Sequence, residues 1–273
     1  MNKALSEIVN NFAEIMKNTS GVLGAWDFGS VSRGMSDEYS DADIVFLADG
    51  DKFVELVKEL EANIARVCEK VLICWEESFN GDAIINNGYL IQKGDGIFQL
   101  DVFLLNYDKI DDYICRIHYS ELTEKDILFD LDGKVKALCG GCSEVNLWSG
   151  DLDGLFKTYL YHFYMTGKYI VRKDYFKLNY VMRTLFDTHA SVLLTAYDRI
   201  SWGGEGNKLG FLPKEKREHL MVYFCCGDFE VNRGNLLKGI DFFGEDFREM
   251  KGGLDFSGLN LVRGYWERIT GEM

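Results

Sequence analysis

The stretch WDFGSVSRGMSDEYSDADIVFL, residues 26–47, indicates both the fold and the chemistry of this chain. One apolar run, residues 22–28, ends in Gly29 and Ser30, and a second, residues 44–47, follows two aspartates. Short apolar runs of this kind predict two buried strands, and we expect a helix to begin after the first. Gly29 would let a phosphate approach the backbone, while the Ser30 hydroxyl and helix N-terminal amides would bind its oxygens.

Three carboxylates predict a metal site. Asp41 and Asp43 are two positions apart at the start of the second strand, so their side chains would point to the same side and repel each other. Asp101 interrupts another almost wholly apolar strand, residues 97–105, where an unpaired charge is costly. Carboxylate oxygens suit Mg²⁺. The three side chains together predict two Mg²⁺ ions that clamp the attacking and leaving oxygens of an in-line displacement.

Simpler explanations exist for each acid taken alone. The Asp41/Asp43 pair also fits a solvated turn, and Asp101 also fits a lone salt bridge. Their joint occurrence with Gly29 and Ser30 favours the metal site.

The remaining pattern predicts an α+β fold in two parts. Helical spacing of apolar residues covers 5–16 and 53–67, and strands are expected at 71–75, 89–93, 97–105 and 127–129, with a hairpin turn at 94–96. After Trp148 the apolar residues follow helical spacing almost throughout. We therefore expect an N-terminal domain, residues 1–148, with a mixed β-sheet flanked by helices. A C-terminal helical bundle, residues 149–273, would cover the substrate and the nucleotide.

Charge and composition restrict the function. The chain has 273 residues, 47% of them hydrophobic, which excludes a disordered protein. The net charge of −14 lies entirely in residues 1–150, and residues 151–273 are neutral. Such acidity repels a nucleic-acid backbone and suits metal ions or cationic small molecules, although it would also serve solubility alone. No apolar run reaches the roughly 18 residues of a membrane span. Without an export signal, the seven cysteines indicate a cytoplasmic protein.

The motif segments resemble those of the polymerase-beta-type nucleotidyltransferase superfamily. The resemblance rests on Gly29-Ser30, on Asp41 and Asp43 about ten residues later, and on Asp101 in a later strand. Residues 29–34 with 37–43 are similar to the lincosamide nucleotidyltransferases, some of which have Glu at the position of Asp43. The strand at Asp101, the segment 127–133 and the tyrosine-rich helical half resemble aminoglycoside 6-adenylyltransferases.

The resemblance implies a transferase of the EC 2.7.7 type that moves a nucleoside monophosphate, with AMP expected, from a nucleoside triphosphate to a hydroxyl. Gly29, Ser30, Arg33 and a helical lysine, Lys168, would bind the triphosphate. Asp41 and Asp43 would bind both Mg²⁺ ions, and Asp101 would complete the second site and serve as a candidate base. The expected acceptor is an aminoglycoside or lincosamide, which would make the chain an antibiotic-resistance enzyme, either monomeric or homodimeric.

Several alternatives remain open. The acceptor could be a protein or an RNA end, with RNA disfavoured by charge, or the chain could be a catalytically silent nucleotide-binding module. Glu76 and Glu77 are rival bases. Lys168, with Arg172 and Lys173, is explained equally well by surface solvation, and for the tyrosines of the helical half we favour packing over ligand stacking.

Two motifs elsewhere imitate other sites. Asp130-Leu131-Asp132-Gly133 resembles a haloacid-dehalogenase-type phosphatase motif, but a strand ending in a hairpin turn explains it better. Cys139 and Cys142 form a single Cys-x-x-Cys pair without the second pair that a zinc ribbon requires.

Overall fold

The chain divides into two compact units, Met1–Val145 and Asn146–Met273. A computed structural model describes residues 2–32, 34, 36–140, 151–197, 208–251 and 256–271. The predicted domain boundary at residue 148 falls outside these ranges, and the roles given to the two predicted domains stay predictions.

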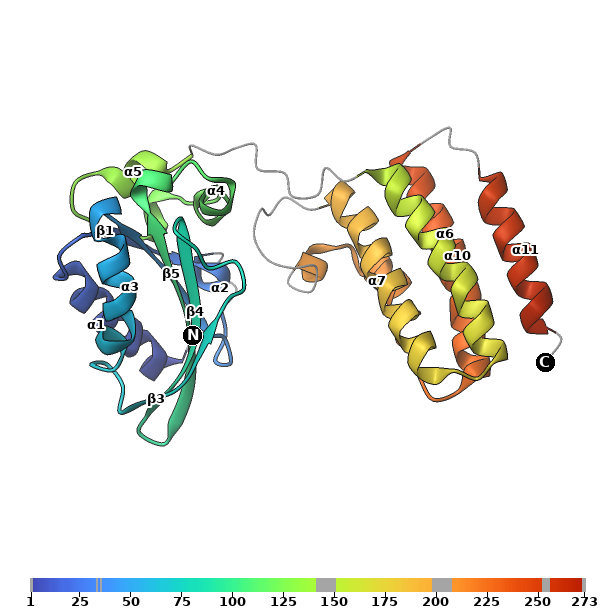
Figure 1. The fold of residues 1–273 in the computed structure, drawn as a ribbon, viewed down its shortest axis with the longest axis horizontal. Helices are drawn as coiled ribbons and strands as arrows, with labels where there is room; N and C mark the ends of the chain where they lie inside the picture. Colours follow the sequence, from blue (N-terminus) through green and yellow to red (C-terminus); the bar gives the residue numbers. More distant parts are fainter. Residues whose placement is uncertain are drawn as a thin grey trace. The chain divides into compact units, whose positions relative to one another are not determined.

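The first unit contains both helices and strands (Figure 1). The elements are α1 (Lys3–Lys17), β1 (Val22–Phe28), α2 (Gly29–Ser32), β2 (Ala42–Ala48), η1 (Gly50–Lys52), α3 (Phe53–Ile64), β3 (Lys70–Glu76), β4 (Ile84–Lys93), β5 (Gly96–Asn106), η2 (Tyr107–Lys109), α4 (Tyr113–Tyr119), η3 (Glu124–Asp126), β6 (Ile127–Asp130) and α5 (Lys134–Leu138). The predicted strands and helices are all present, and α4 and α5 are helices that the sequence reading did not anticipate.

The six strands form one mixed sheet in the order β3-β4-β5-β2-β1-β6. β2 and β5 run parallel, and the other neighbouring pairs run antiparallel. The parallel pair lies in the middle of the sheet, where both neighbours of each strand satisfy its backbone groups. This pairing confirms the predicted mixed sheet and joins two segments far apart in the sequence.

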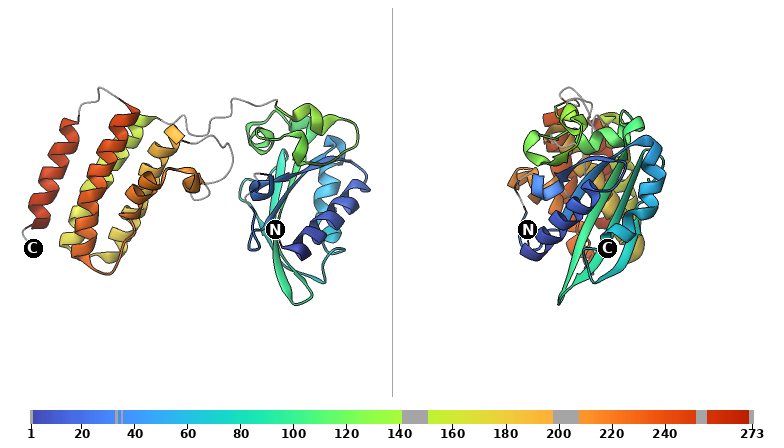
Figure 2. Two further views of the ribbon diagram at one scale, coloured as in Figure 1. Left: turned by 180° about the vertical axis from the view of Figure 1, so that it is seen from behind. Right: turned by 90° about the vertical axis from the view of Figure 1, so that its left-hand side faces the viewer.

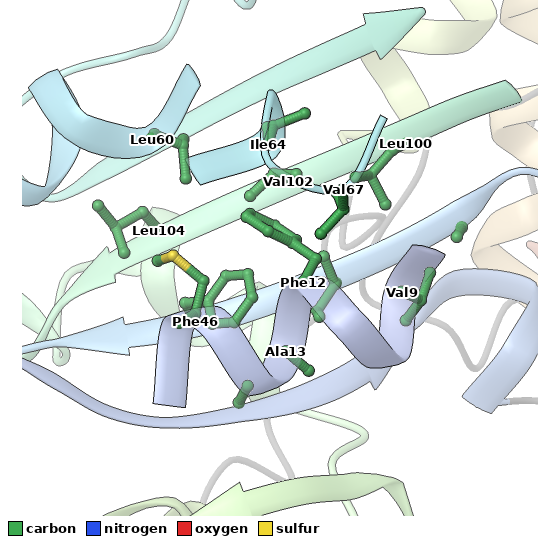
Figure 3. Close-up of a cluster of buried hydrophobic side chains, with 14 of the residues drawn as sticks. Val9, Phe12, Ala13, Phe46, Leu60, Ile64, Val67, Leu100, Val102 and Leu104 are labelled. Carbon is green, nitrogen blue, oxygen red and sulfur yellow. The ribbon is translucent and has the colours of Figure 1, made fainter. Parts of the chain in front are cut away.

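One face of the sheet packs against α1 and α3 (Figure 3). Phe12 of α1 is fully buried and meets Phe46 of β2 edge-on, with ring centroids 5.2 Å apart. Leu60 and Ile64 of α3 complete the layer beside Val102 of β5. The residues on this face alternate along each strand with those on the opposite face. Part of the opposite face is covered by α4, whose His118 lies against Phe28 of β1 and Phe103 of β5, with ring centroids 5.5 and 4.8 Å apart.

The β4–β5 hairpin is longer than the sequence predicts. Pairing extends from Lys93 and Gly96 at the turn to Ile84 and Leu105 at the far end. The prediction began the strand only at Tyr89, because residues 86–88 are two asparagines and a glycine, which have low strand propensity. Pairing with β3 on one side and β5 on the other overrides that propensity.

The described part of the second unit contains helices joined by short turns and no strand, as predicted (Figure 2). It contains α6 (Leu152–Val171), α7 (Tyr175–Tyr197), η4 (Leu209–Phe211), α9 (Lys214–Met221), α10 (Phe229–Met250) and α11 (Ser257–Gly271). Among these helices, α10 begins at Phe229 because Asp228 caps it. The Asp228 carboxylate accepts hydrogen bonds from the backbone N–H groups of Glu230 and Val231, at 2.8 and 3.2 Å.

Packing explains some of the tyrosines of this unit but not all. Tyr159 is fully buried and stacks on Phe243 with ring centroids 3.6 Å apart. Tyr161 and Tyr180 are instead 63% and 74% exposed. The packing interpretation is therefore confirmed for Tyr159 and is wrong for these two.

A buried polar network joins α7, α9 and α10. Asp246, 1% exposed, accepts hydrogen bonds from His189 and His219 at 2.8 Å each and from Lys216 at 2.6 Å. Burial alone would raise the pKa of Asp246, but the hydrogen bonds from these three side chains lower it to about 2. The network holds a charged carboxylate inside the helical core.

No helix in the described ranges is long and apolar enough to cross a membrane.

Candidate active site

The junction between β1 and α2 is shaped by a glycine. Gly29 has a φ of +64°, in the left-handed region that favours glycine. A Cβ at this position would lie 1.9 Å from Oδ2 of Asp43, so no side chain fits there. The Ser32 hydroxyl donates to the Gly29 carbonyl at 3.1 Å and closes the short turn. The chain thereby brings a bare stretch of backbone against one of the predicted metal ligands.

Ser30 follows at the same turn. Its Oγ is buried and has no hydrogen-bond partner among the described residues. Buried hydroxyls in folded proteins nearly always have a partner, so an orphaned one indicates a missing ligand. A phosphate oxygen would satisfy it, as predicted from the sequence. Arg33, also predicted to bind the triphosphate, lies outside the described residues.

Two of the predicted metal ligands are neighbours on parallel strands. Asp43 of β2 is the register partner of Asp101 of β5, and Phe28 at the end of β1 is the partner of Asp43 on the other side. Partners in a sheet project their side chains to the same face. Asp41 directly precedes β2 and raises the pKa of Asp101 through its charge. The structure therefore brings the three predicted carboxylates into one region.

The surroundings of Asp101 favour its protonated form. Burial raises the pKa of Asp101 to about 6, and the negative charges of Asp41 and Glu77 add to the rise. A hydrogen bond from Gln99 Nε2 to Asp101 Oδ2, 3.1 Å long, acts in the opposite direction. A raised pKa makes the Asp101 carboxylate a better proton acceptor than an ordinary aspartate, which is useful for a group that takes a proton during a reaction.

Hydrogen bonds among residues 37–40 hold the chain just before β2. The Asp37 carboxylate accepts hydrogen bonds from the Tyr39 backbone N–H at 2.9 Å and from the Ser40 hydroxyl at 3.1 Å. The Ser40 hydroxyl in turn accepts from the Asp37 backbone N–H at 2.9 Å. These bonds hold the residues immediately before Asp41.

The donor set has the chemistry of a magnesium site. All three predicted ligands are carboxylates, the oxygen donors that Mg²⁺ prefers, and Asp101 is electrostatically strained by its acidic neighbours. Within the described ranges, no group of three or more His, Cys, Asp or Glu side chains is already arranged around a point that a metal would occupy. The residues present fit the ion by chemistry, and the number of ions stays a prediction.

The two rival bases, Glu76 and Glu77, are successive residues and point to opposite faces of the sheet. Glu77 lines a pocket of about 310 Å³ together with Asp101, whereas Glu76 does not line it. The charge of Glu76 acts instead on Cys74, which packs toward the α1/α3 side of the sheet. Glu77 is therefore part of the same region as Asp101.

Three other sequence features lie apart from this region or remain untested. The Asp130 carboxylate accepts hydrogen bonds from the backbone N–H groups of Val135 and Lys136, at 3.3 and 2.9 Å, in the first turn of α5. The predicted turn after β6 is present, but it leads into a helix, so the predicted hairpin is wrong. Cys142 of the Cys-x-x-Cys pair falls outside the described residues. Lys168 belongs to the second unit, where its ammonium lies 4.6 Å from the centre of the Tyr164 ring. Its predicted role at the triphosphate stays a prediction.

Comparison with known families agrees with this geometry. The model of the nucleotidyltransferase domain family matches residues 9–123, which include Gly29, Ser30 and all three aspartates. Residues 9–123 are a nucleotidyltransferase domain. This match confirms, for this domain, the predicted resemblance to the polymerase-beta-type nucleotidyltransferase superfamily, and with it a transferase of the EC 2.7.7 type.

Individual relatives add little to the nucleotidyltransferase assignment. No curated protein sequence matches the chain. Among solved structures, an aminoglycoside 6-adenyltransferase from Bacillus subtilis aligns over 98% of this chain and 99% of its own, with 14% sequence identity and a TM-score of 0.40. A likeness this slight does not bear on the substrate of this chain.

Sequence reasoning missed two residues of the site region. Gln99, which donates to Asp101, stands two positions earlier on β5, so period-two alternation would have found it. Gly88 of β4 is the register partner of Asp101, and a Cβ there would lie 2.9 Å from Asp101 Oδ1. No sequence pattern predicts that contact, because it depends on the register between two strands.

Proposed function

We propose that this nucleotidyltransferase moves AMP from Mg²⁺-bound ATP to a hydroxyl of a small cationic acceptor, an aminoglycoside or a lincosamide. The observation that carries the proposal is the pairing of Asp43 with Asp101 beside a glycine turn whose next residue has an orphaned hydroxyl. A triphosphate needs exposed backbone and a hydroxyl donor, and its metal needs the carboxylates.

Each residue has a definite task. Gly29 makes room for the Asp43 carboxylate at the turn and is proposed to let the phosphates approach its backbone, and the Ser30 hydroxyl is proposed to donate to a phosphate oxygen. Asp41, Asp43 and Asp101 would hold the ions, and a bound divalent cation supplies charge neutralisation on the α-phosphate and the leaving group. Arg33 and Lys168 are proposed to offset the remaining phosphate charge.

Proton transfer falls to Asp101. Its carboxylate accepts the proton of the acceptor hydroxyl while that oxygen forms a bond to the α-phosphorus. The bond between the α-phosphorus and the bridging oxygen to the β-phosphate breaks, and pyrophosphate leaves with the electron pair. Burial and the neighbouring acids raise the pKa of Asp101, which makes its carboxylate a better proton acceptor than an ordinary aspartate.

The acceptor class rests on charge. The net charge of −14 lies in the part of the chain that holds the site, and the Asp101 region contains Glu77 as a further acid. An acidic site attracts cationic drugs and repels nucleic acid. That attraction is screened beyond about 8–10 Å at physiological ionic strength, so the Michaelis constant for a cationic acceptor should rise with salt more than that for ATP.

A direct assay tests the proposal. The purified chain is incubated with Mg²⁺, with each of the four α-labelled ribonucleoside triphosphates in turn, and with a panel of aminoglycosides and lincosamides. We expect labelled acceptor carrying one added nucleoside monophosphate, and none after chelation of Mg²⁺. Transfer of label to protein, with every drug left unmodified, would replace the antibiotic acceptor by a protein one.

A further inference from the structure

A row of register partners crosses the sheet through the proposed base. Trp75 of β3 pairs with Gly88 of β4, Gly88 pairs with Asp101 of β5, and Asp101 pairs with Asp43 of β2. All four positions face the same side of the sheet. Neighbouring strands lie about 4.8 Å apart, so the Trp75 backbone is roughly 10 Å from that of Asp101. Between them stands a residue with no side chain.

The glycine opens a pocket between the indole and the carboxylate. A Cβ at Gly88 would lie 2.9 Å from Asp101 Oδ1 and 3.9 Å from Trp75 Cβ. The pocket at this position measures about 310 Å³, and its lining includes Ile73, Trp75, Glu77 and Asp101. This volume is at the lower end of the range for small-molecule sites, which suits a single ring.

One wall of the pocket is apolar and open to solvent. Trp75 is 67% exposed and Ile73 is 51% exposed, both on the edge strand β3. Tryptophan is highly buried on average, and an aromatic side chain contributes most to binding energy when another ring stacks on it. Ile73, Trp75 and Glu77 alternate along the chain, so the apolar wall ends in a carboxylate. Their arrangement offers a flat surface with an acid at one end.

The charge of the pocket identifies its occupant. The two carboxyl side chains that line it, Glu77 and Asp101, are acidic, and no lysine or arginine is among its described lining residues. Such a lining disfavours a triphosphate and favours a cation. A hydroxylated ring that carries an amine matches both the flat wall and the acids.

We propose that Trp75 is the platform on which a ring of the acceptor stacks, across the gap left by Gly88, with the ring's hydroxyl toward Asp101 and its amine toward Glu77. The occupant is an aminosugar or aminocyclitol ring. This inference rests on the proposed function and adds the residues that select the acceptor.

Steady-state kinetics with kanamycin as acceptor separate the platform from the chemistry. Trp75→Ala should raise the Michaelis constant for kanamycin about tenfold, the loss expected for one stacked ring, and leave the constant for ATP unchanged. Trp75→Phe should restore part of the loss. Leu72→Ala is the matched control, because Leu72 is also exposed on β3 but does not line the pocket. A raised constant for ATP, or an unchanged one for kanamycin, would overturn the inference.

A binding measurement keeps the inference separate from the transfer reaction. Kanamycin is titrated into the full chain with a non-hydrolysable ATP analogue and Mg²⁺, and tryptophan fluorescence is followed. We expect a saturable fluorescence change in the wild type that is absent in Trp75→Phe. The wild type should bind N-acetylated kanamycin more weakly than kanamycin, whereas Glu77→Gln should bind the two with similar affinity. If kanamycin binds in this way but is not modified, the proposed function is refuted and the platform stands. If kanamycin is modified but does not bind in this way, the platform is refuted and the proposed function stands. If kanamycin neither binds nor is modified, both are refuted.

Discussion

Asp43 and Asp101 are register partners on the parallel strands β2 and β5, and the Cβ position of Gly29 points at the Asp43 carboxylate from the end of β1. Backbone hydrogen bonds of the central sheet therefore set the spacing of the two acids, independently of any ligand. The site is preformed at the level of the backbone, and its side chains can be tested one at a time.

Removal of a single metal-ligand charge should abolish transfer without unfolding the domain. We expect Asp41→Asn or Asp43→Asn to lower kcat/KM at least about 100-fold, or roughly 2.7 kcal/mol, because each loses a ligand charge rather than a core contact. Thermal denaturation should show an almost unchanged midpoint. Asp51→Asn, an exposed change on η1, is the control and should keep full activity. Full activity in either site variant at ordinary Mg²⁺ would contradict the mechanism.

Gly29→Ala should damage the site more than its backbone strain alone explains. The left-handed φ costs an alanine about 1–2 kcal/mol, and the added Cβ would also displace the Asp43 carboxylate. We expect loss of transfer together with a lowered melting temperature. Gly94→Ala is a matched control, because Gly94 has a φ of +59° and nothing lies within 4 Å of its Cβ position. Equal activity in the two variants would show that the contact with Asp43 is unimportant.

Asp27→Asn should stabilise the first unit near neutral pH. Burial, with a smaller contribution from Asp126, raises the pKa of Asp27 from 3.8 to about 6. The folded state then binds more protons than the unfolded state between about pH 4 and 6, so this carboxyl lowers stability as pH rises through that window. We expect a gain of about 1–2 kcal/mol for Asp27→Asn at pH 7.5, allowing for partial exposure, that shrinks toward pH 4.

Denaturant unfolding of the two proteins at several pH values measures this difference. The exposed Asp111→Asn serves as the control and should change stability little at any pH. A pH-independent difference between Asp27→Asn and the wild type would argue against a raised pKa.

Asp246→Asn should destabilise the helical unit. The change leaves His189, His219 and Lys216 without the charge toward which all three donate. Breaking a buried charge network of this kind costs on the order of 3 kcal/mol. Glu249→Gln, which removes the 59% exposed partner of Lys216, should cost less than about 1 kcal/mol. Circular dichroism melts of both variants test the contrast, and equal midpoints would rule out a stabilising role for Asp246.

The parts of the site that lie close together in the chain were accessible to sequence reasoning. The turn at Gly29 and Ser30 follows β1, and Asp41 and Asp43 stand at the start of β2. The apolar runs beside these residues indicate both strands correctly. Asp101 was recognisable because a charge inside an apolar strand needs a partner.

Contacts that depend on register were not accessible. The position of Gly88 against Asp101 follows from ten successive pairs between β4 and β5, and the asparagines before it concealed half of that strand. The network at Asp246 likewise joins three helices from residues that carry no common motif. Periodicity predicts which face a residue occupies, but not which residue of another element meets it.

The row from Trp75 to Asp43 constrains how the gene can change. A single-residue insertion or deletion within β4 would turn every later side chain of that strand to the other face and move Gly88 out of line with its partners. A point mutation in this strand changes one side chain, whereas an insertion or deletion there displaces every residue that pairs across the row from Trp75 to Asp43. Changes in length should therefore accumulate in the turns of this domain, and its substrate range should evolve by point mutation at the edge strand.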